Sequence, residues 1–466
     1  MGQRPKRMLI DCSEANGRGV IDFTRQPTGI PRVVLKYIEV GYEWGRRTGI
    51  PVIPVLPHLG GAALVRPVPG KNPPPQLVEM ATKDKIDLFG HELAFGFANY
   101  FAQVSYHLVY LIAAMLPFNP VKVFAKWLDS AFIQKMRGFV QRIDKRMHTE
   151  GYQIDLRPGD LFFTPAYWHD IDPAIYRSIR AAGANVVVLI HDLLPIIFDR
   201  FYPAPWCYEF RDKVRAVCGY ADAIFCVSDF TRSALIEFGS RQKQKMPPVM
   251  TAYNGFEPLA DREALGNSLI RPPVLNAFDG PRPFLMVGTV EPKKGHLPTI
   301  KCFEEIWRAG YKRNLVIIGR CGWLEKSIVD AIEHSPYFGE KLFWFAEIDD
   351  FDLATAYHQS HALILSSFGE GFGLPMIEAS FFGKPTIALD TPTAREILGN
   401  AGLFFRDAWG MVDRIVELEN AEIYQKACEA ALRVSWPSWD DYTPRVFDKL
   451  AVVADDPKRL PERVAF

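Results

Sequence analysis

The chain has 466 residues, of which 48% are hydrophobic and 23% are charged, as is usual for a globular protein. This length is too great for one ordinary hydrophobic core, so it predicts two domains. The 54 basic side chains equal the 54 acidic ones, and bulk charge therefore argues against a nucleic-acid-binding protein.

The seven cysteines are scattered, with no Cys-x2-Cys pair and no Cys/His spacing typical of a zinc site. Their odd number argues against a disulfide framework and favours a reducing cytosol. The basic N-terminus precedes only a short apolar run, so we expect no signal peptide there. These features predict a cytoplasmic protein without a structural metal.

In chain order, the first predicted elements are a strand, a glycine turn and a helix. Residues 8–10 are apolar and end at Asp11. Gly29 follows, and apolar residues recur at helical spacing after it. A second short strand is predicted over 52–56. Alternating strands and helices of this kind are typical of an α/β protein.

The next region departs from this alternation. Residues 67–75 are rich in proline and predict a stiff linker. Within 93–147, an uncharged apolar stretch is followed by a helix-period stretch with one basic side. This order is typical of a helical anchor lying in the plane of a membrane surface. The alternative is a helical hairpin that packs on the protein or on a second subunit, and the sequence favours neither.

Strands and helices alternate again from residue 160. Residues 186–190 are entirely apolar, as in the strands of parallel sheets. His191 and Asp192 come directly after this run, where the predicted strand ends. A second His-Asp pair at residues 169 and 170 is the weaker candidate for a functional site, because it lies outside the sequence motif that contains residues 191 and 192.

A proline-rich linker over 257–283 leads to a predicted strand over 284–287. The loop after this strand reads Gly-Thr-Val-Glu-Pro-Lys-Lys-Gly and contains Thr289, Lys293 and Lys294.

The most informative stretch is 366–379, which follows a predicted strand over 362–365 and reads SSFGEGFGLPMIEA. Its glycines allow a sharp turn and a close approach to a ligand, and Pro375 suits the start of a helix. The free N–H groups at the start of that helix suit a phosphate group. Glu370 and Glu378 flank the loop and could hold sugar hydroxyls.

This stretch resembles the Glu-x7-Glu signature of retaining, nucleotide-sugar-dependent glycosyltransferases of the GT-B type, family 4. The resemblance covers roughly residues 8–60 and 155–455 and is strongest in the second half. It implies an α/β fold of two Rossmann-like domains that face each other across a cleft. The implied parts are an N-terminal acceptor-side domain over 1–265 with the helical insertion at 93–147, a nucleotide-sugar-binding domain over 281–435, and a C-terminal helix within 436–466 that crosses back to the first domain.

The same resemblance implies residue roles. Lys294 would stabilise the leaving diphosphate, Glu370 would hold the donor sugar and Glu378 the ribose. The implied catalytic residues are His191, Asp192, Glu370 and Lys294, and the implied donor-binding residues are Gly29, Thr289, Lys293, Gly371, Phe372, Gly373, Leu374 and Glu378. Thr289 departs from the family pattern, which has arginine at this position. Lys293 is a candidate to supply the positive charge that this arginine would provide.

The implied reaction transfers a hexose from a nucleoside diphosphate sugar, with retention of the anomeric configuration. GDP-mannose is our first expectation for the donor, because VGTVEPKKGH resembles mannosyl- and rhamnosyl-transferring members. The expected acceptor is a saccharide or polyprenyl-linked saccharide of bacterial surface polysaccharide. We expect no cofactor and no metal, because a lysine and a helix dipole can neutralise the diphosphate. If 93–147 binds membrane, the protein would lie peripherally on the inner face of the cell membrane.

Three alternatives stay open at this point. Two are other GT-B enzymes, a sugar-nucleotide epimerase or a phosphorylase, because fold does not determine reaction. The third is a non-catalytic partner that binds sugar nucleotides. This alternative stays open because Thr289 stands where the family has arginine. A glycosidase with paired carboxylates is a weaker interpretation, since it leaves the phosphate-type loop unexplained.

Overall fold

The computed structural model describes residues 5–13, 29–57, 63–65, 152–260, 275–457, 460–461 and 463–464. The predicted insertion at 93–147 and the linker at 67–75 lie outside the described residues. The chain divides into two compact units. The first comprises Met1–Val188, Tyr220–Asp222 and Leu450–Pro457, and the second comprises Leu189–Gly219, Ala223–Lys449 and Lys458–Phe466.

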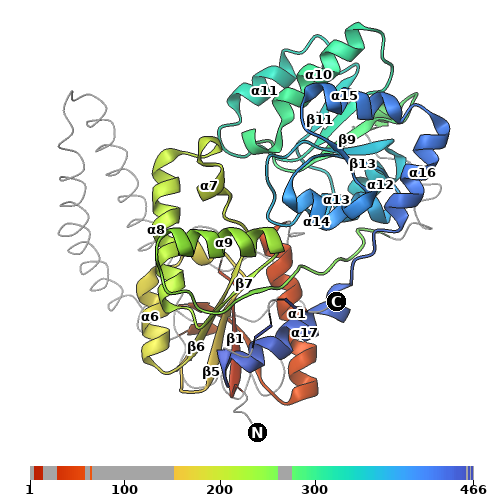
Figure 1. Ribbon diagram of the computed structural model, residues 1–466. Helices are drawn as coiled ribbons and strands as arrows, with labels where there is room; N and C mark the ends of the chain where they lie inside the picture. Colours follow the sequence, from red (N-terminus) through yellow and green to blue (C-terminus); the bar gives the residue numbers. More distant parts are fainter. Residues whose placement is uncertain are drawn as a thin grey trace, which may run out of the picture. The chain divides into compact units, whose positions relative to one another are not determined.

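One sheet has eight strands in the order β4-β3-β2-β1-β5-β6-β7-β8, and Figure 1 labels β1, β5, β6 and β7 of this sheet. The strands are β1 (Arg7–Asp11), β2 (Val52–Pro57), β3 (Ala63–Val65), β4 (Tyr152–Ile154), β5 (Asp160–Thr164), β6 (Asn185–Ile190), β7 (Ala223–Cys226) and β8 (Val249–Thr251). Strand β1 pairs in parallel with β2 and β5, as do β5 with β6 and β7 with β8. The short strand β3 pairs antiparallel with β2 and β4.

Helices connect these strands. They are α1 (Ile30–Thr48), α6 (Pro173–Ala181), α7 (Leu194–Ile197), α8 (Ala204–Tyr220) and α9 (Asp229–Arg241). Local chemistry explains where they begin and end: the side chain of Ser228 accepts a hydrogen bond from the third residue of α9, and α1 ends at Gly49 in a left-handed conformation. A buried ion pair between Arg7 of β1 and Asp160 of β5 joins two neighbouring strands, with Arg7 Nε 2.9 Å from Asp160 Oδ1.

The second sheet has six strands in the order β11-β10-β9-β12-β13-β14, and the pairs along it are parallel. The strands are β9 (Phe284–Val287), β10 (Leu315–Ile318), β11 (Leu342–Phe345), β12 (Ala362–Leu365), β13 (Thr386–Leu389) and β14 (Leu403–Phe405). The helices are α10 (His296–Arg308), α11 (Lys326–Glu333), α12 (Asp350–Gln359), α13 (Leu374–Phe381), α14 (Pro392–Leu398), α15 (Ala408–Glu417) and α16 (Ala421–Leu432). Helix α17 (Trp439–Val453) follows, and its residues from Leu450 belong to the first unit.

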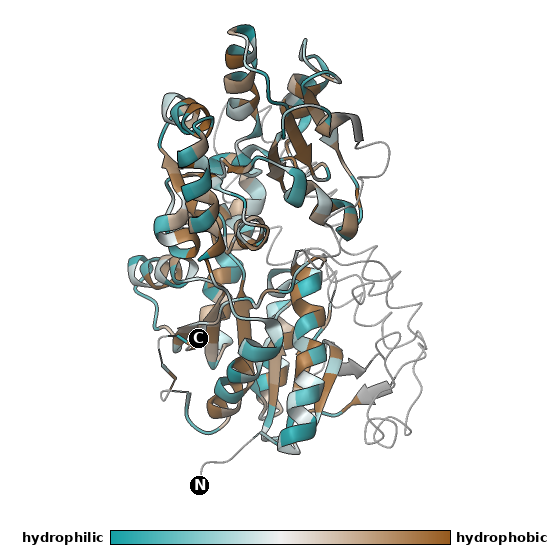
Figure 2. Cartoon of the chain, turned by 90° about the vertical axis from the view of Figure 1, so that its right-hand side faces the viewer, coloured by the Kyte–Doolittle hydropathy of each residue, from teal (hydrophilic) through white to brown (hydrophobic). Residues whose placement is uncertain are grey.

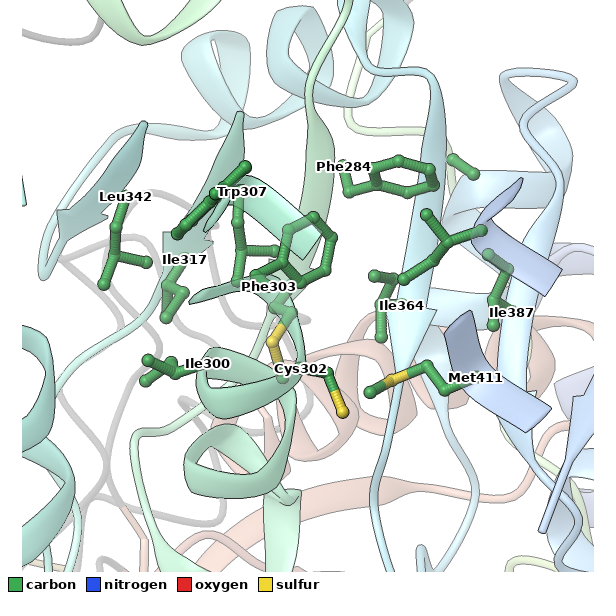
Figure 3. Packing of buried hydrophobic residues seen from close by; sticks show 14 of the residues in the cluster. Phe284, Ile300, Cys302, Phe303, Trp307, Ile317, Leu342, Ile364, Ile387 and Met411 are labelled. Atoms are coloured by element: carbon green, nitrogen blue, oxygen red, sulfur yellow. The ribbon is translucent and has the colours of Figure 1, made fainter. Parts of the chain in front are cut away.

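Apolar strands and the inner faces of the helices form the cores. Figure 2 shows the strands mostly in hydrophobic colours, whereas several helices have one hydrophilic and one hydrophobic side. In the six-stranded sheet, the ring of Phe303 on α10 lies 5.7 Å from that of Phe284 on β9 and 5.3 Å from that of Trp307 (Figure 3). This close packing sets the strand ends from which the functional loops leave.

Within the described part of the chain, no helix has both the length and the apolar character needed to cross a membrane.

Candidate functional site

The site begins where the strand order of the six-stranded sheet reverses. Strand β9 is followed to one side by β10 and β11, whereas β12 lies on its other side and is followed by β13 and β14. Loops that leave the carboxyl ends of two such neighbouring parallel strands diverge and leave room for a ligand. Residues 288–295 follow β9, and residues 366–373 follow β12.

Hydrogen bonds join these two loops. The backbone N–H of Phe368 donates to the carbonyl of Lys293 at 2.9 Å, and the hydroxyl of Ser366 donates to the carbonyl of Lys294 at 3.0 Å. Thr299, in the first turns of α10, donates to the Ser366 hydroxyl oxygen at 2.8 Å. The position of one loop therefore determines the position of the other.

Lys294 and Glu370 meet across the joined loops. Lys294 Nζ donates to Glu370 Oε1 at 2.6 Å, and both side chains are almost buried. Burial opposes the negative charge of Glu370, yet Lys294 and Lys293 outweigh this and hold the pKa of its carboxyl below the usual value. The carboxyl of Glu370 is therefore ionised at neutral pH.

Lys293 lies in a second group of charges. Its Nζ is 3.4 Å from Glu291 Oε1, and its side chain is only 13% exposed. Burial disfavours its positive charge, but the nearby carboxylates of Asp192, Glu291 and Glu370 raise the pKa of the Lys293 ammonium above its usual value. The structure thus brings Lys293 and Asp192, both predicted from sequence, into electrostatic contact.

His191 and Asp192 follow β6 and lie against the glycine loop. A Cβ atom built on Gly371 would lie 2.0 Å from the carbonyl oxygen of His191 and 3.0 Å from Asp192 Cβ, so only glycine fits at this position. Asp192 Oδ1 accepts a hydrogen bond from the N–H of Leu194 at 3.0 Å, which fixes the carboxylate close to the backbone.

The glycine loop ends in helix α13. Gly373 precedes the helix with a φ of 103°, a conformation that favours glycine, and Pro375 lies in the first turn. Leu374 is the first residue of α13. The start of a helix carries its positive dipole end, which favours an anion. In α13, Pro375 has no N–H and the N–H of Met376 donates to the carbonyl of Gly373, so an anion would bind to backbone N–H groups that precede Pro375.

Glu378 lies further along α13 and is 8% exposed. The hydroxyl of Tyr357, on α12, donates to Glu378 Oε2 at 2.8 Å. Because Tyr357 is fully buried, this bond fixes the orientation of the carboxylate. A carboxylate held in this way can accept hydrogen bonds from a diol.

The remaining predicted residues have varied surroundings. Thr289 is exposed in the loop after β9. Phe372 is buried, and its ring lies 5.3 Å from that of Trp436, so only its backbone is available to a ligand. Gly29 caps α1 with a φ of 62° and belongs to the first unit, whereas the other predicted site residues belong to the second. The pair His169–Asp170 also belongs to the first unit.

Sequence reasoning missed several residues near the site. The carboxylate of Glu291 contacts the ammonium of Lys293. The hydroxyl of Thr393 donates to the carbonyl oxygen of Glu370 at 2.8 Å. The ammonium of Lys293 lies over the ring of Tyr202, 5.9 Å from its centre. Glu291 lies in the same loop as Lys293 and Lys294, and this position is the sequence feature that could have identified it as a site residue. Thr393 and Tyr202 reach the site only through tertiary packing.

In the described ranges, no group of three or more His, Cys, Asp or Glu side chains is arranged to hold a metal ion.

Solved structures establish the fold class. The chain superimposes on α,α-trehalose 6-phosphate synthase from Burkholderia multivorans with a TM-score of 0.60 and 14% identity, covering 97% of this chain and 99% of that one. It superimposes on HepE from Anabaena, solved with UDP and glucose, with a TM-score of 0.55 and 13% identity, covering 96% and 100%. The chain has the GT-B fold with two Rossmann-like sheets, and the fold expected from the sequence is confirmed.

Sequence relatives are more specific. Residues 270–432, which contain both joined loops, match the family described as Glycosyl transferases group 1. The chain is 34% identical over 291 residues to the serotype-specific mannosyltransferase WbdA of Escherichia coli, covering 60% of this chain and 35% of that protein. It is 25% identical over 237 residues to O-antigen chain mannosyltransferase B of Escherichia coli, covering 50% and 59%. The chain therefore spans about a third of the length of WbdA.

Proposed function

We propose that this protein is a retaining glycosyltransferase of the Glu-x7-Glu group, family 4. It transfers mannose from GDP-mannose to a saccharide or polyprenyl-linked saccharide during synthesis of a bacterial surface polysaccharide. The group 1 domain over 270–432 and the similarity to mannosyltransferases of O-antigen synthesis support this proposal.

The observation that carries the proposal is the Lys294–Glu370 pair beside the start of α13. An almost buried cation, the start of α13 and two carboxylates lie near the carboxyl ends of parallel strands. A nucleoside diphosphate sugar presents the complementary groups, namely a diphosphate with hydroxyl groups on both sides.

The chemical roles follow from charge. When the bond between sugar and diphosphate breaks, negative charge develops on the leaving diphosphate. Lys294 and the amides at the start of α13 are already in place to stabilise that charge, and such preorganised stabilisation contributes to catalysis. Glu370 accepts hydrogen bonds from the donor sugar, and Glu378, held by Tyr357, accepts them from the ribose. His191 and Asp192 hydrogen-bond and orient the sugar or the acceptor.

These groups can perform their roles without a metal or cofactor, since Lys294, Lys293 and the helix dipole supply positive charge. We place the protein in the cytoplasm, peripherally on the inner face of the membrane if the 93–147 segment binds there. Flotation of the full chain and of a chain lacking 93–147 with anionic vesicles tests this placement. Equal behaviour of the two chains would contradict it.

The function is tested first by thermal unfolding with GDP, UDP, TDP and ADP, each with and without EDTA. A ligand at a concentration of 100 times its Kd stabilises the native state by about 2.7 kcal/mol. We expect GDP alone to raise the Tm, with no effect of EDTA. NMR analysis of the sugar released or transferred from GDP-mannose should then show retained α configuration. An inverted product, or the absence of any nucleotide effect, would refute the proposal.

The exposed Thr289 favours one rival, a non-catalytic protein that binds sugar nucleotides. That protein would show the GDP-dependent rise in Tm but would release no GDP from GDP-mannose. Release of GDP that depends on Lys294 and Glu370 would exclude it.

A further inference from the structure

Three aromatic rings pack together beside the proposed donor loops. The ring of Tyr202 lies 5.4 Å from Trp206 and 5.4 Å from Trp323, and the rings of Trp206 and Trp323 are 5.5 Å apart. Trp206 is in the first turn of α8, and Trp323 is in the loop after β10. We refer to Tyr202, Trp206 and Trp323 as the aromatic platform.

The platform has a buried base and an open surface. Tyr202 is 5% exposed, Trp206 is half-buried and Trp323 is 42% exposed. Leu324, next to Trp323, is 51% exposed and has a φ of 55°. Left-handed backbone is strained for leucine, and strain of this kind is found most often at functional sites. The loop after β10 therefore presents the partly exposed ring of Trp323 next to a strained residue.

The platform is continuous with the charged loop after β9. The Lys293 ammonium lies 5.9 Å from the centre of the Tyr202 ring. A Cβ atom built on Gly322 would lie 2.7 Å from Thr289 Cγ2 and 3.2 Å from Glu291 Cβ, so the residue before Trp323 packs directly on that loop. Charged groups therefore border the rings on the side of Lys293.

We propose that the aromatic platform is the binding surface for a pyranose ring of the saccharide acceptor. This inference rests on the proposed function, for which it names the acceptor subsite. A pyranose has a flat face of C–H groups that can stack on the exposed Trp323, and hydroxyls around its edge that can bond to Glu291 and Asp192. Ligand sites of this composition combine aromatic walls with a few polar groups.

The donor nucleobase is the competing occupant, since it also stacks on aromatic rings. The surroundings favour the acceptor sugar. The platform contacts the loop that carries Lys293, next to the carboxylates of Asp192 and Glu370. The carboxylate proposed for the ribose, Glu378, is bonded instead to Tyr357 of α12. An acceptor beside Lys293 and Asp192 is close to the groups that hold the reacting sugar.

The test uses the full chain with Trp323→Ala, Trp323→Phe and a matched control, Trp409→Ala. Trp409 is 80% exposed on α15 and is not part of the platform. Saccharide binding is measured by saturation-transfer NMR with mannotriose and the methyl α-glycosides of mannose, glucose and galactose. GDP affinity and hydrolysis of GDP-mannose without acceptor are measured on the same samples.

We expect Trp323→Ala to weaken saccharide binding about tenfold, which corresponds to about 1.4 kcal/mol. Trp323→Phe should recover part of this loss, and Trp409→Ala should bind as the wild type does. GDP affinity and hydrolysis of GDP-mannose should stay the same in all three variants, because the ring contacts of Trp323 are with Tyr202 and Trp206 and not with Lys293 or Lys294 themselves.

Three results would overturn the inference. The first is equal saccharide binding by wild type and Trp323→Ala, including no binding by either. The second is an equal loss in Trp409→Ala. The third is a tenfold loss of GDP affinity in Trp323→Ala, which would assign the platform to the nucleobase. If no protein binds GDP or hydrolyses GDP-mannose, the proposed function fails on its own, while the NMR result still decides whether the platform binds sugar.

Discussion

Lys294 and Glu370 form an ion pair with 2.6 Å between Nζ and Oε1. The cation that we assign to the diphosphate is thus neutralised, before any donor binds, by the carboxylate that we assign to the donor sugar. With the roles proposed above, donor binding adds partners to both residues: Lys294 binds the phosphate with its remaining N–H groups, and Glu370 accepts hydrogen bonds from the sugar hydroxyls. The pair therefore links diphosphate binding to sugar binding.

The first prediction concerns Glu370→Gln. Without the carboxylate, Lys294 and Lys293 are left in need of an anion, so GDP should bind about tenfold more tightly, equal to about 1.4 kcal/mol. Turnover of GDP-mannose should nevertheless fall about a hundredfold, because the sugar loses its charged partner. Titration calorimetry with GDP and a kcat measurement with GDP-mannose test both effects.

Glu305→Gln is the control for this variant. Glu305 pairs with Arg308 on the exposed side of α10, and exposed pairs contribute little. GDP affinity and turnover should both remain as in the wild type. Weaker GDP binding by Glu370→Gln would contradict the competition between carboxylate and diphosphate.

The second prediction concerns the missing arginine at position 289. If Lys293 replaces it, Lys293→Met should weaken GDP binding about tenfold, through loss of one charge–phosphate contact of about 1.4 kcal/mol. Adding Thr289→Arg to this variant should restore most of the affinity, because Thr289 is exposed and lies in the same loop as Lys293. GDP affinities of the single and double variants are compared by calorimetry.

Thr289→Arg alone serves as the reference for this comparison. A double variant that binds GDP no better than Lys293→Met would show that the two positions do not share a role. Unchanged affinity in Lys293→Met would remove Lys293 from the donor site altogether.

The third prediction concerns Gly371→Ala. The added Cβ would lie 2.0 Å from the His191 carbonyl oxygen, and backbone can yield only by shifting the whole loop. We expect a loss of about 3 kcal/mol in the free energy of unfolding, as for other overpacked sites. Urea denaturation measures it. Gly219→Ala is the matched control, since a Cβ there meets nothing within 4 Å, and alanine in a helix should be neutral or slightly stabilising.

The fourth prediction concerns pH. Burial and the charge of Arg313 lower the pKa of His361 from 6.5 to about 4. In the unfolded chain, His361 takes up a proton near pH 6.5, whereas the folded protein does so only near pH 4. The unfolded state therefore binds more protons between these values, and stability falls as the pH decreases from 6.5 to 4.

His361→Phe should remove about 2 kcal/mol of this acid-dependent loss. Phenylalanine keeps a ring against Tyr424, on which His361 stacks at 4.2 Å. Urea denaturation at pH 7 and pH 5 tests the effect, with the exposed His334→Phe as control. His296, whose pKa burial lowers to about 4, should retain its own contribution. Identical pH profiles for His361→Phe and wild type would contradict the prediction.

Much of the site was predictable from the sequence because its local parts are specified by neighbouring residues. An apolar run followed by Gly369–Gly373 and Pro375 specifies strand, loop and helix, since glycine and proline restrict or free the backbone at fixed positions. The same reasoning predicted the strand before His191, and the resemblance of these motifs predicted the GT-B fold that the solved structures confirm.

Contacts between distant residues could not be predicted in this way. Lys294 and Glu370 are 76 residues apart, and they meet because β9 pairs with β12 although two strands separate them in the chain. The sequence by itself determined which residues carry charge and where the backbone turns. Only the tertiary structure decided which charges face each other, which glycine has no room for a side chain, and that Trp323 lies on Tyr202, because strand order and helix packing set these distances.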